Sequence, residues 1–97
     1  MAEWVLPSTR RCGYYDCSEF SGLKRSPERR ATLYEIEYFL EDAGETYLDG
    51  VPYRMRHDHV LVAHPGQVRY SQLPFRTLFL KFSAADALAA LLDGLPP

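Results

Sequence analysis

Turn signals divide the second half of this sequence so closely that only short strands fit between them. Asp49-Gly50, Pro65-Gly66 and Leu73-Pro74 each interrupt the chain, because Gly and Pro end regular elements or shape turns. The apolar runs between these signals are brief and show no helical period. Short strands at such spacing are typical of an antiparallel sandwich or barrel. The sequence therefore predicts a mainly β domain.

The stretch from Leu33 to Glu41 gives the clearest single strand. Its residues alternate in character, with one face made by Tyr34, Ile36, Tyr38 and Leu40 and the other by Glu35, Glu37 and Glu41. Successive side chains of a strand point to opposite faces. We expect the aromatic and aliphatic face to be buried and the acidic face to be solvated.

A β-hairpin is predicted around Asp49-Gly50, because both residues tolerate the positive φ of a two-residue type I′ turn. Pro52 cannot donate to a strand ladder, so the second strand of this hairpin should lie at a sheet edge. Asp58 is a further position that can adopt positive φ, because Asp tolerates the left-handed region better than most residues. The remaining expected strands are 60–63, 68–71 and 75–82.

One C-terminal helix is predicted over residues 83–94. Ser83 can act as the N-cap, Asp86 stands where a capping-box acid would, and Gly94 with the two closing prolines supplies the stop. The apolar stripe consists of Leu88, Leu91, Leu92 and Leu95. We interpret it as core packing, with a partner-binding face as the alternative.

Length and charge restrict the organisation and the partners. A chain of 97 residues is one domain, which we divide into an irregular N-terminal arm (1–30), barrel strands (31–82) and the helix (83–94). The net charge of −2 lacks the cationic excess with which nucleic-acid binders neutralise phosphates, so no direct nucleic-acid contact is expected. A domain this small buries a modest share of its surface, and we expect a homodimer.

No segment has the pattern of a secretory signal or a membrane span, so no membrane partner is expected and the cytoplasm is the expected location. The two cysteines, Cys12 and Cys17, should then be reduced thiols. A disulfide between them is the competing interpretation and would require an oxidising compartment.

Several ordered motifs resemble one known family. They are Tyr34-Glu35-Ile36-Glu37-Tyr38-Phe39-Leu40-Glu41-Asp42, Gly44-Glu45-Thr46-Tyr47 with Asp49-Gly50, His64-Pro65-Gly66-Gln67 with Arg69-Tyr70-Ser71, and Leu73-Pro74-Phe75-Arg76 with the run from Phe79 to Phe82. In this order they resemble the N-terminal cupin-like sensor domain of AraC-type transcription regulators. The tail from Leu91 to Pro96 is similar to the helix that follows the barrel in such regulators. The resemblance covers roughly residues 30–97.

The resemblance implies a cupin-like double-stranded β-helix, that is, a jelly-roll barrel, with one C-terminal α-helix. It also implies an interior pocket for a small effector, commonly a sugar or related metabolite, and a separate helix-turn-helix domain that contacts DNA. No helix-turn-helix unit fits within this sequence, so we expect a sensor segment that reaches DNA only through another domain.

Comparison with metal-binding cupins argues against a metal or any other cofactor. Glu35 can stand at the family's glutamate position, but the histidine positions fall at about Arg29, Ala31 and Arg69. Arginine offers no lone pair and repels a cation. His57 and His59, with His64 nearby, form the one local cluster that could chelate a metal, against the simpler interpretation of a solvated turn.

The expected function is therefore binding without catalysis, by seven residues: Arg30, Tyr34, Glu35, Tyr38, His64, Arg69 and Tyr70. An arginine fork and a carboxylate suit a sugar or an organic acid, and tyrosine rings give the apolar wall. The alternatives are an internal Arg69–Glu35 ion pair, a solvated Glu35 and tyrosines that serve cross-strand packing. The basic loop that contains Lys24, Arg25, Arg29 and Arg30 is solvated or an anion site.

Two other functions remain open at this point. One is a stand-alone metal-dependent cupin enzyme built on the three histidines and Glu35, and the other is a dimerisation module without a ligand.

Overall fold

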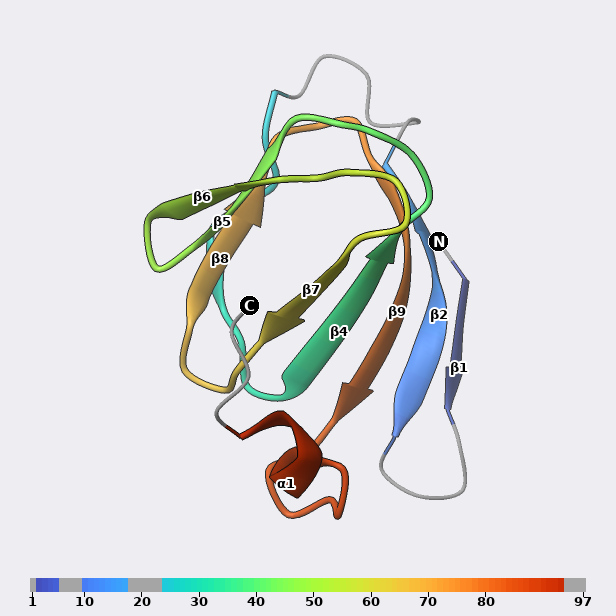
Figure 1. Ribbon diagram of the computed structural model, residues 1–97, viewed down its shortest axis with the longest axis vertical. Helices are drawn as coiled ribbons and strands as arrows, with labels where there is room; N and C mark the ends of the chain where they lie inside the picture. The colour runs from blue at the N-terminus through green and yellow to red at the C-terminus, as the bar shows by residue number, and fades with distance from the viewer. Residues whose placement is uncertain (1, 6–9, 18–23, 94–97) are drawn as a thin grey trace.

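The computed structural model describes residues 2–5, 10–17 and 24–93 and arranges them in two antiparallel sheets and one short helix (Figure 1). The five-stranded sheet has the order β1-β2-β9-β4-β7, and the four-stranded sheet has the order β3-β8-β5-β6. The mainly β class is therefore confirmed. No helix in the described part of the chain has the length and apolar character to cross a membrane.

The strands of the five-stranded sheet are β1 (Ala2–Val5), β2 (Arg11–Asp16), β4 (Tyr34–Phe39), β7 (Val60–Ala63) and β9 (Arg76–Phe82). Those of the four-stranded sheet are β3 (Arg29–Arg30), β5 (Glu45–Leu48), β6 (Val51–Arg54) and β8 (Val68–Ser71). Strands that are far apart in the sequence pair in the five-stranded sheet, where β9 lies between β2 and β4.

The predicted hairpin is confirmed. Asp49 and Gly50 have φ angles of +49° and +81°, as a type I′ turn requires. Pro52 lies in β6, which is the edge strand of its sheet. Asp58 also has positive φ, +64°.

The N-terminal arm differs from the prediction. Residues 2–5 and 11–16 form β1 and β2 of the five-stranded sheet instead of an irregular segment. The cause is tertiary: β2 pairs along its whole length with β9, and this pairing prevails over a polar local sequence. Cys12 and Cys17 are not joined in a disulfide.

The C-terminal helix is shorter than predicted. Only α1 (Ala89–Leu92) is α-helical, and no side chain caps it. Asp86 does not act in a capping box, because its carboxylate accepts from the Leu88 backbone and from Arg10. The predicted stop at Gly94 to Pro97 and the stripe residue Leu95 lie outside the described residues.

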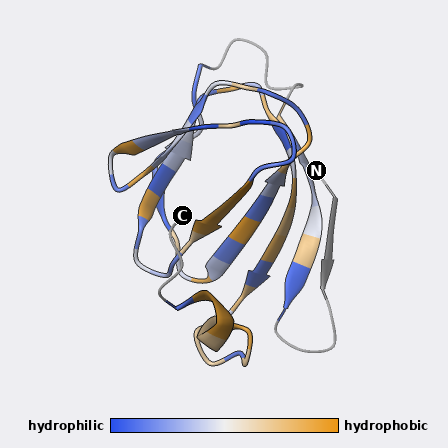
Figure 2. Cartoon of the chain, in the orientation of Figure 1, coloured by the Kyte–Doolittle hydropathy of each residue, from blue (hydrophilic) through white to orange (hydrophobic). Residues whose placement is uncertain are grey.

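The largest correction concerns β4, where Glu35 and Glu37 point inward, as the pocket role of Glu35 requires and the expected solvated acidic face does not. Glu35 and Glu37 are 3% and 8% exposed and face the space between the sheets, whereas Ile36 and Tyr38 lie on the outer face and are half-buried. Figure 2 shows the alternation of hydrophilic and hydrophobic residues along β4. The alternating pattern identified the strand but not its buried side, because an interior lined with ion pairs is polar.

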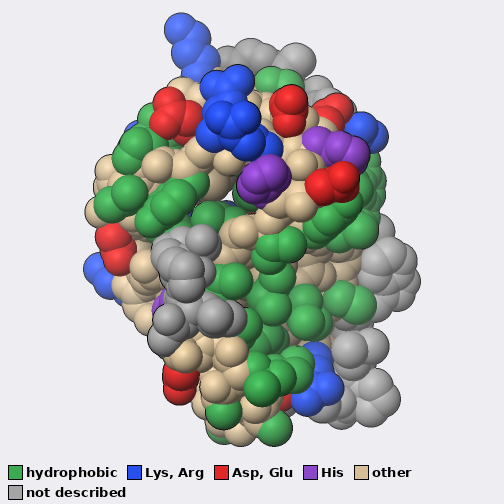
Figure 3. All heavy atoms as spheres, in the orientation of Figure 1, with side chains coloured by type: hydrophobic (Ala, Val, Ile, Leu, Met, Phe, Trp, Pro, Cys, Tyr) green, Lys and Arg blue, Asp and Glu red, His purple; other side chains and the backbone are tan. Residues whose placement is uncertain are grey.

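Two apolar clusters hold the fold together. The first lies between the sheets and comprises Cys17, Phe39, Leu48, Met55, Leu61, Ala63 and Phe75. The second lies on the outer face of the five-stranded sheet, where Tyr34 and Phe82 stack at 5.4 Å and pack against Ala89 of α1. The helix thus covers one end of a sheet face whose remainder carries exposed Val60 and Leu78. Hydrophobic side chains gather over β7, β4 and β9 in Figure 3.

Candidate functional site

A cavity of about 270 Å³ lies between the inner faces of the two sheets. This volume is close to the lower end of the usual range for small-molecule pockets, about 300–1,000 Å³. Five charged side chains line it: Arg29, Glu35, Glu37, Arg69 and Lys81. The other lining residues are the hydroxyl residues Tyr15, Ser26, Tyr70, Ser71 and Thr77, and the apolar residues Pro27, Phe75 and Phe79.

The cavity runs from the protein surface to a buried floor. The Arg29 side chain is 47% exposed, whereas that of Glu35, to which it is paired, is 4% exposed. Pro27 is exposed as well, and Arg69 and Thr77 are buried. The segment 26–29 therefore lies at the mouth, and β4, β8 and β9 form the floor.

Glu35 is the centre of a buried ion-pair network. Arg29 donates to it through both terminal nitrogens, with Nη1 to Oε2 and Nη2 to Oε1 both at 2.8 Å. Arg69 Nη1 donates to the same Oε1 at 2.8 Å, and its Nη2 donates to Glu37. The pairing of β3 with β8 sets this geometry, because Arg29 and Arg69 are register partners. One guanidinium thus joins two neighbouring carboxylates of β4.

The charges around Glu35 keep it ionised. Burial on its own would raise the pKa of this carboxyl, but the hydrogen bonds from Arg29 and the positive charges of Arg69, Arg29 and Lys81 outweigh burial and lower the pKa. The Lys81 ammonium lies 4.0 Å from Glu35 Oε2. Three cations thus surround two carboxylates in the lining, which leaves one positive charge in excess.

The other end of the cavity carries hydroxyl groups. Thr77 is fully buried, and its Oγ1 has no hydrogen-bond partner among the residues that the structure describes. A buried hydroxyl without a partner is costly, by about 1–3 kcal/mol, so this atom is a site for a donor or acceptor inside the cavity. Burial and a hydrogen bond with Cys17 raise the pKa of Tyr15 to about 12, which keeps its phenol protonated.

Three of the seven predicted binding residues line the cavity: Glu35, Arg69 and Tyr70. The Tyr70 ring also stacks on Tyr47 at 4.6 Å and lies under the Arg25 guanidinium at 4.4 Å. Arg69 and Glu35 form the internal ion pair that was the alternative to ligand binding, and this pair lies in the cavity wall.

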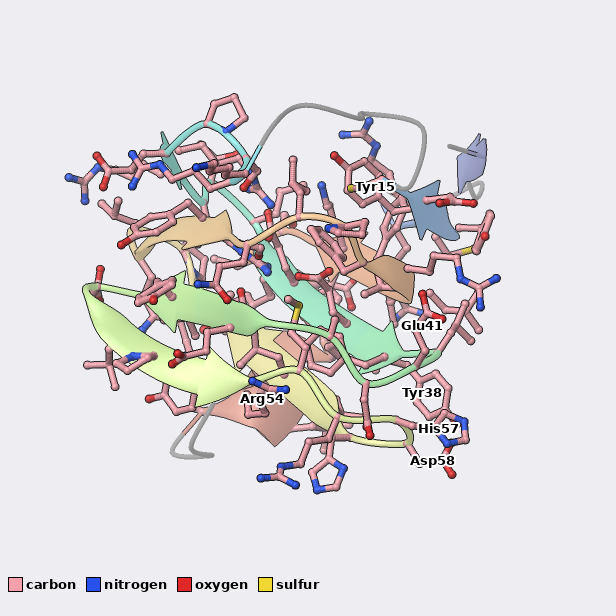
Figure 4. All side chains as sticks on the ribbon, turned by 90° about the horizontal axis from the view of Figure 1, so that it is seen from above. Tyr15, Tyr38, Glu41, Arg54, His57 and Asp58 are labelled. Carbon is pink, nitrogen blue, oxygen red and sulfur yellow. The ribbon has the colours of Figure 1, made fainter. Side chains whose placement is uncertain are left out.

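The other four predicted residues, Arg30, Tyr34, Tyr38 and His64, lie elsewhere. Arg30 is exposed and donates to the carbonyl of Gly66. Tyr34 donates to Asp93 at 2.8 Å, and His64 lies edge-on to the Tyr34 ring. Tyr38 is on the outer face and bonds to Asp58. Figure 4 shows Tyr38 beside His57 and Asp58, well away from Tyr15 in the cavity wall.

Sequence reasoning missed Arg29, Glu37, Lys81 and Thr77 as lining residues. Arg29 and Arg30 are adjacent in β3 and point to opposite sides, so only one of them can enter the cavity. The available signal was the cupin comparison, which aligned Arg29 with a ligand position. Glu37 follows from Glu35 by the strand period once Glu35 is known to face inward.

These residues do not fit the divalent metal of metal-binding cupins. Both oxygens of Glu35 already accept from guanidinium groups, and a cation would be repelled by the same groups. In the described part of the chain, no three His, Cys, Asp or Glu side chains are grouped to hold a metal ion. His57 and His59 are exposed, and the His57 imidazole pairs with Asp58 at 3.1 Å.

Comparisons with known proteins identify the fold. No protein-family model matches the sequence, and no curated protein matches it. Among solved structures, the Clostridium difficile EutQ protein aligns with a TM-score of 0.62 and 15% identity over 79% of this chain and 59% of its own. The Schizosaccharomyces pombe Cnp3 cupin domain aligns with a TM-score of 0.58 and 15% identity over 94% and 66%. The chain spans less than two thirds of either neighbour, and it has the cupin fold.

Proposed function

We propose that this chain is the effector-binding domain of a bacterial AraC-type transcription regulator, which binds a small polar metabolite between its two sheets. Two observations support the proposal: the ordered motifs from Tyr34 to Phe82 and the cupin fold of the chain. DNA contact belongs to a separate helix-turn-helix domain, because this domain has a net charge of −2 and lacks the excess of cationic side chains that binds phosphates.

The observation that carries the proposal is the cavity itself. It has the size of a small metabolite, is lined by charged and hydroxyl groups, and contains a buried Thr77 hydroxyl without a partner among the described residues. Polar groups that converge on a concavity are a usual feature of a small-molecule site.

We further propose binding without turnover. Catalysis by a general acid or base needs a group whose pKa is near the working pH. The pKa of Glu35 is lowered and that of Tyr15 is raised to about 12, so both are far from neutrality. These two groups are suited to holding a ligand in place and poorly suited to moving a proton.

A thermal-shift screen of sugars, sugar acids and other small metabolites tests ligand binding. A compound at one hundred times its Kd raises the stability of the folded state by about 2.7 kcal/mol. We expect one chemical class to raise the melting temperature, and Thr77→Val to reduce that shift. Thr32→Val is the matched control, because Thr32 is exposed and outside the cavity lining. If no class shifts the melting temperature, the proposal fails.

The regulator context has its own test. The reading frame that encodes this chain should also encode two helix-turn-helix units after residue 97. A reading frame that joins the chain to a different kind of domain would refute the regulator and leave the binding site unaffected.

We also propose a cytoplasmic homodimer. Two cysteines that are not joined in a disulfide accord with a reducing compartment, and the 70% exposed Leu91 of α1 offers an apolar contact at the helix surface. Sedimentation across a concentration series should show a dimer that Leu91→Glu dissociates. A wild-type protein that stays monomeric at high concentration would exclude this association.

A further inference from the structure

Strand β9 presents three successive inward side chains to the cavity: Thr77, Phe79 and Lys81. They share one face because side chains alternate along a strand. The Lys81 ammonium lies 5.1 Å from the centre of the Phe79 ring, and the buried Thr77 hydroxyl has no hydrogen-bond partner within residues 2–5, 10–17 and 24–93. At about 3.3 Å per residue, the Cα atoms of Thr77 and Lys81 are roughly 13 Å apart. The strand thus offers a cationic group and a hydroxyl group on either side of an aromatic surface.

The carboxylate at the centre of the cavity is already engaged. Glu35 accepts three hydrogen bonds from Arg29 and Arg69, which makes it a poor acceptor for a further sugar hydroxyl. Both terminal nitrogens of Arg69 donate to carboxylates, and its side chain is 5% exposed. Arg69 and Glu35 therefore act as the frame of the cavity, and Lys81 and Thr77 are better placed to meet a ligand.

The net positive charge of the cavity favours a negatively charged ligand. The three cations and two carboxylates of the lining leave one positive charge, and Lys81 reaches its nearest carboxylate only at 4.0 Å. An ammonium has three donors, and a charge in a poorly solvated site is stabilised when it is paired. A ligand with one negative charge would neutralise the cavity, whereas a dianion would reverse its charge.

We propose that the ligand is a small monocarboxylic acid, with its carboxylate on Lys81, its body against Phe79 and a hydroxyl or carbonyl oxygen on Thr77. This inference rests on the proposed effector site and assigns the chemical class of its occupant. Arg29, at the mouth and 47% exposed, can add a second cation to the carboxylate without disturbing the buried floor.

The test is a calorimetric and thermal-shift titration with small hydroxy acids, sugar acids and hydroxybenzoates, each paired with its amide or neutral parent. Glucuronate against glucose and 4-hydroxybenzoate against 4-hydroxybenzamide are two such pairs, and inorganic phosphate represents a dianionic source. We expect monocarboxylates to bind, and their neutral partners and phosphate to bind at least tenfold more weakly.

Variants of the two lysines assign the contact. Lys81→Gln should weaken acid binding at least tenfold, and Lys81→Arg should restore most of it. Lys24→Gln makes the same chemical change at an exposed position outside the cavity lining and should leave binding unchanged. Thr77→Val should weaken binding severalfold for acids with a second oxygen. Near-ultraviolet circular dichroism of each unliganded variant verifies that it is folded.

The failure of this inference can be distinguished from failure of the effector site. Neutral sugars that bind as well as their acids, with Lys81→Gln indifferent to both, would overturn the carboxylate assignment and keep the site. Acids that bind Lys81→Gln with wild-type affinity would also overturn it. If none of these compounds binds but another class in the metabolite screen does, this inference is wrong and the effector site stands; if no class binds, both are wrong.

Discussion

Replacing Arg69 by Met tests the buried network most directly. The Arg69 side chain is 5% exposed and donates to Glu35 and Glu37, whose side chains are 4% and 11% exposed. Met keeps most of the apolar stem but removes the charge. Glu35 keeps its two bonds from Arg29, whereas Glu37 loses the partner that shields its buried charge.

The expected cost is large for a domain of this size. Removing one partner of a buried ion pair costs about 3–5 kcal/mol. Each kcal/mol lowers the melting temperature of a domain of 60–100 residues by about 4–8 °C, so we expect a fall of roughly 12–40 °C. This is a substantial part of a typical total stability of about 5–15 kcal/mol.

The assay is urea unfolding and differential scanning calorimetry of the variant, with two comparisons. Arg76→Met removes a similar two-nitrogen pair with Glu41, but that pair is exposed and should cost at most about 1 kcal/mol. A double variant with Arg69→Met and Glu37→Gln removes the uncompensated charge of Glu37 and keeps the Arg29–Glu35 pair, so it should regain most of the lost stability. Equal costs at Arg69 and Arg76, or a double variant no better than the single one, would refute the reasoning.

Three further outcomes are expected. Thr77→Val removes a buried hydroxyl that has no partner in the described part of the chain, so the unliganded protein should gain about 1 kcal/mol in urea unfolding; a loss of that size would mean that the hydroxyl is satisfied. Gly50→Ala places a Cβ where no atom lies within 4 Å, so the cost of about 1–2 kcal/mol would come from the positive φ alone, and Gly50→Asn should cost less in the same assay. The lowered pKa of Glu35 stabilises the fold above its ordinary value of 4.5, and this stabilisation is lost as the pH falls through the folded-state pKa. When the pH is lowered below about 4.5, the melting temperature should therefore decrease, and it should decrease less steeply in Glu35→Gln.

Local chemistry was sufficient to predict the elements whose form is decided within a few residues. The Asp49-Gly50 turn, the edge position of Pro52 and the positive φ of Asp58 depend on backbone preferences that each residue carries with it. They could therefore be predicted from the sequence.

Properties decided by partners far along the chain could not be predicted in this way. β2 is a strand because β9 pairs with it, and no pattern within residues 11–16 signals that pairing. The cavity depends likewise on Arg29 and Arg69 being opposite each other on β3 and β8, 40 positions apart. The resemblance to a family predicted that Glu35 and Arg69 lie in one pocket. It did not predict that they would hydrogen-bond to each other instead of remaining available to a ligand.

The reversed faces of β4 determine how its register is chosen. A shift by one residue would turn Ile36 and Tyr38 inward and both glutamates outward, since the side-chain period of a strand is two. The same shift would turn Phe39 out of the apolar cluster between the sheets and Tyr34 away from Phe82, so apolar contacts also favour the observed pairing of β4 with β9 and β7. The guanidinium groups of Arg29 and Arg69 favour it as well, because this register brings carboxylates to meet them. In this strand, electrostatic recognition shares in specifying the alignment of the sheet, a task that most β proteins leave to their apolar residues.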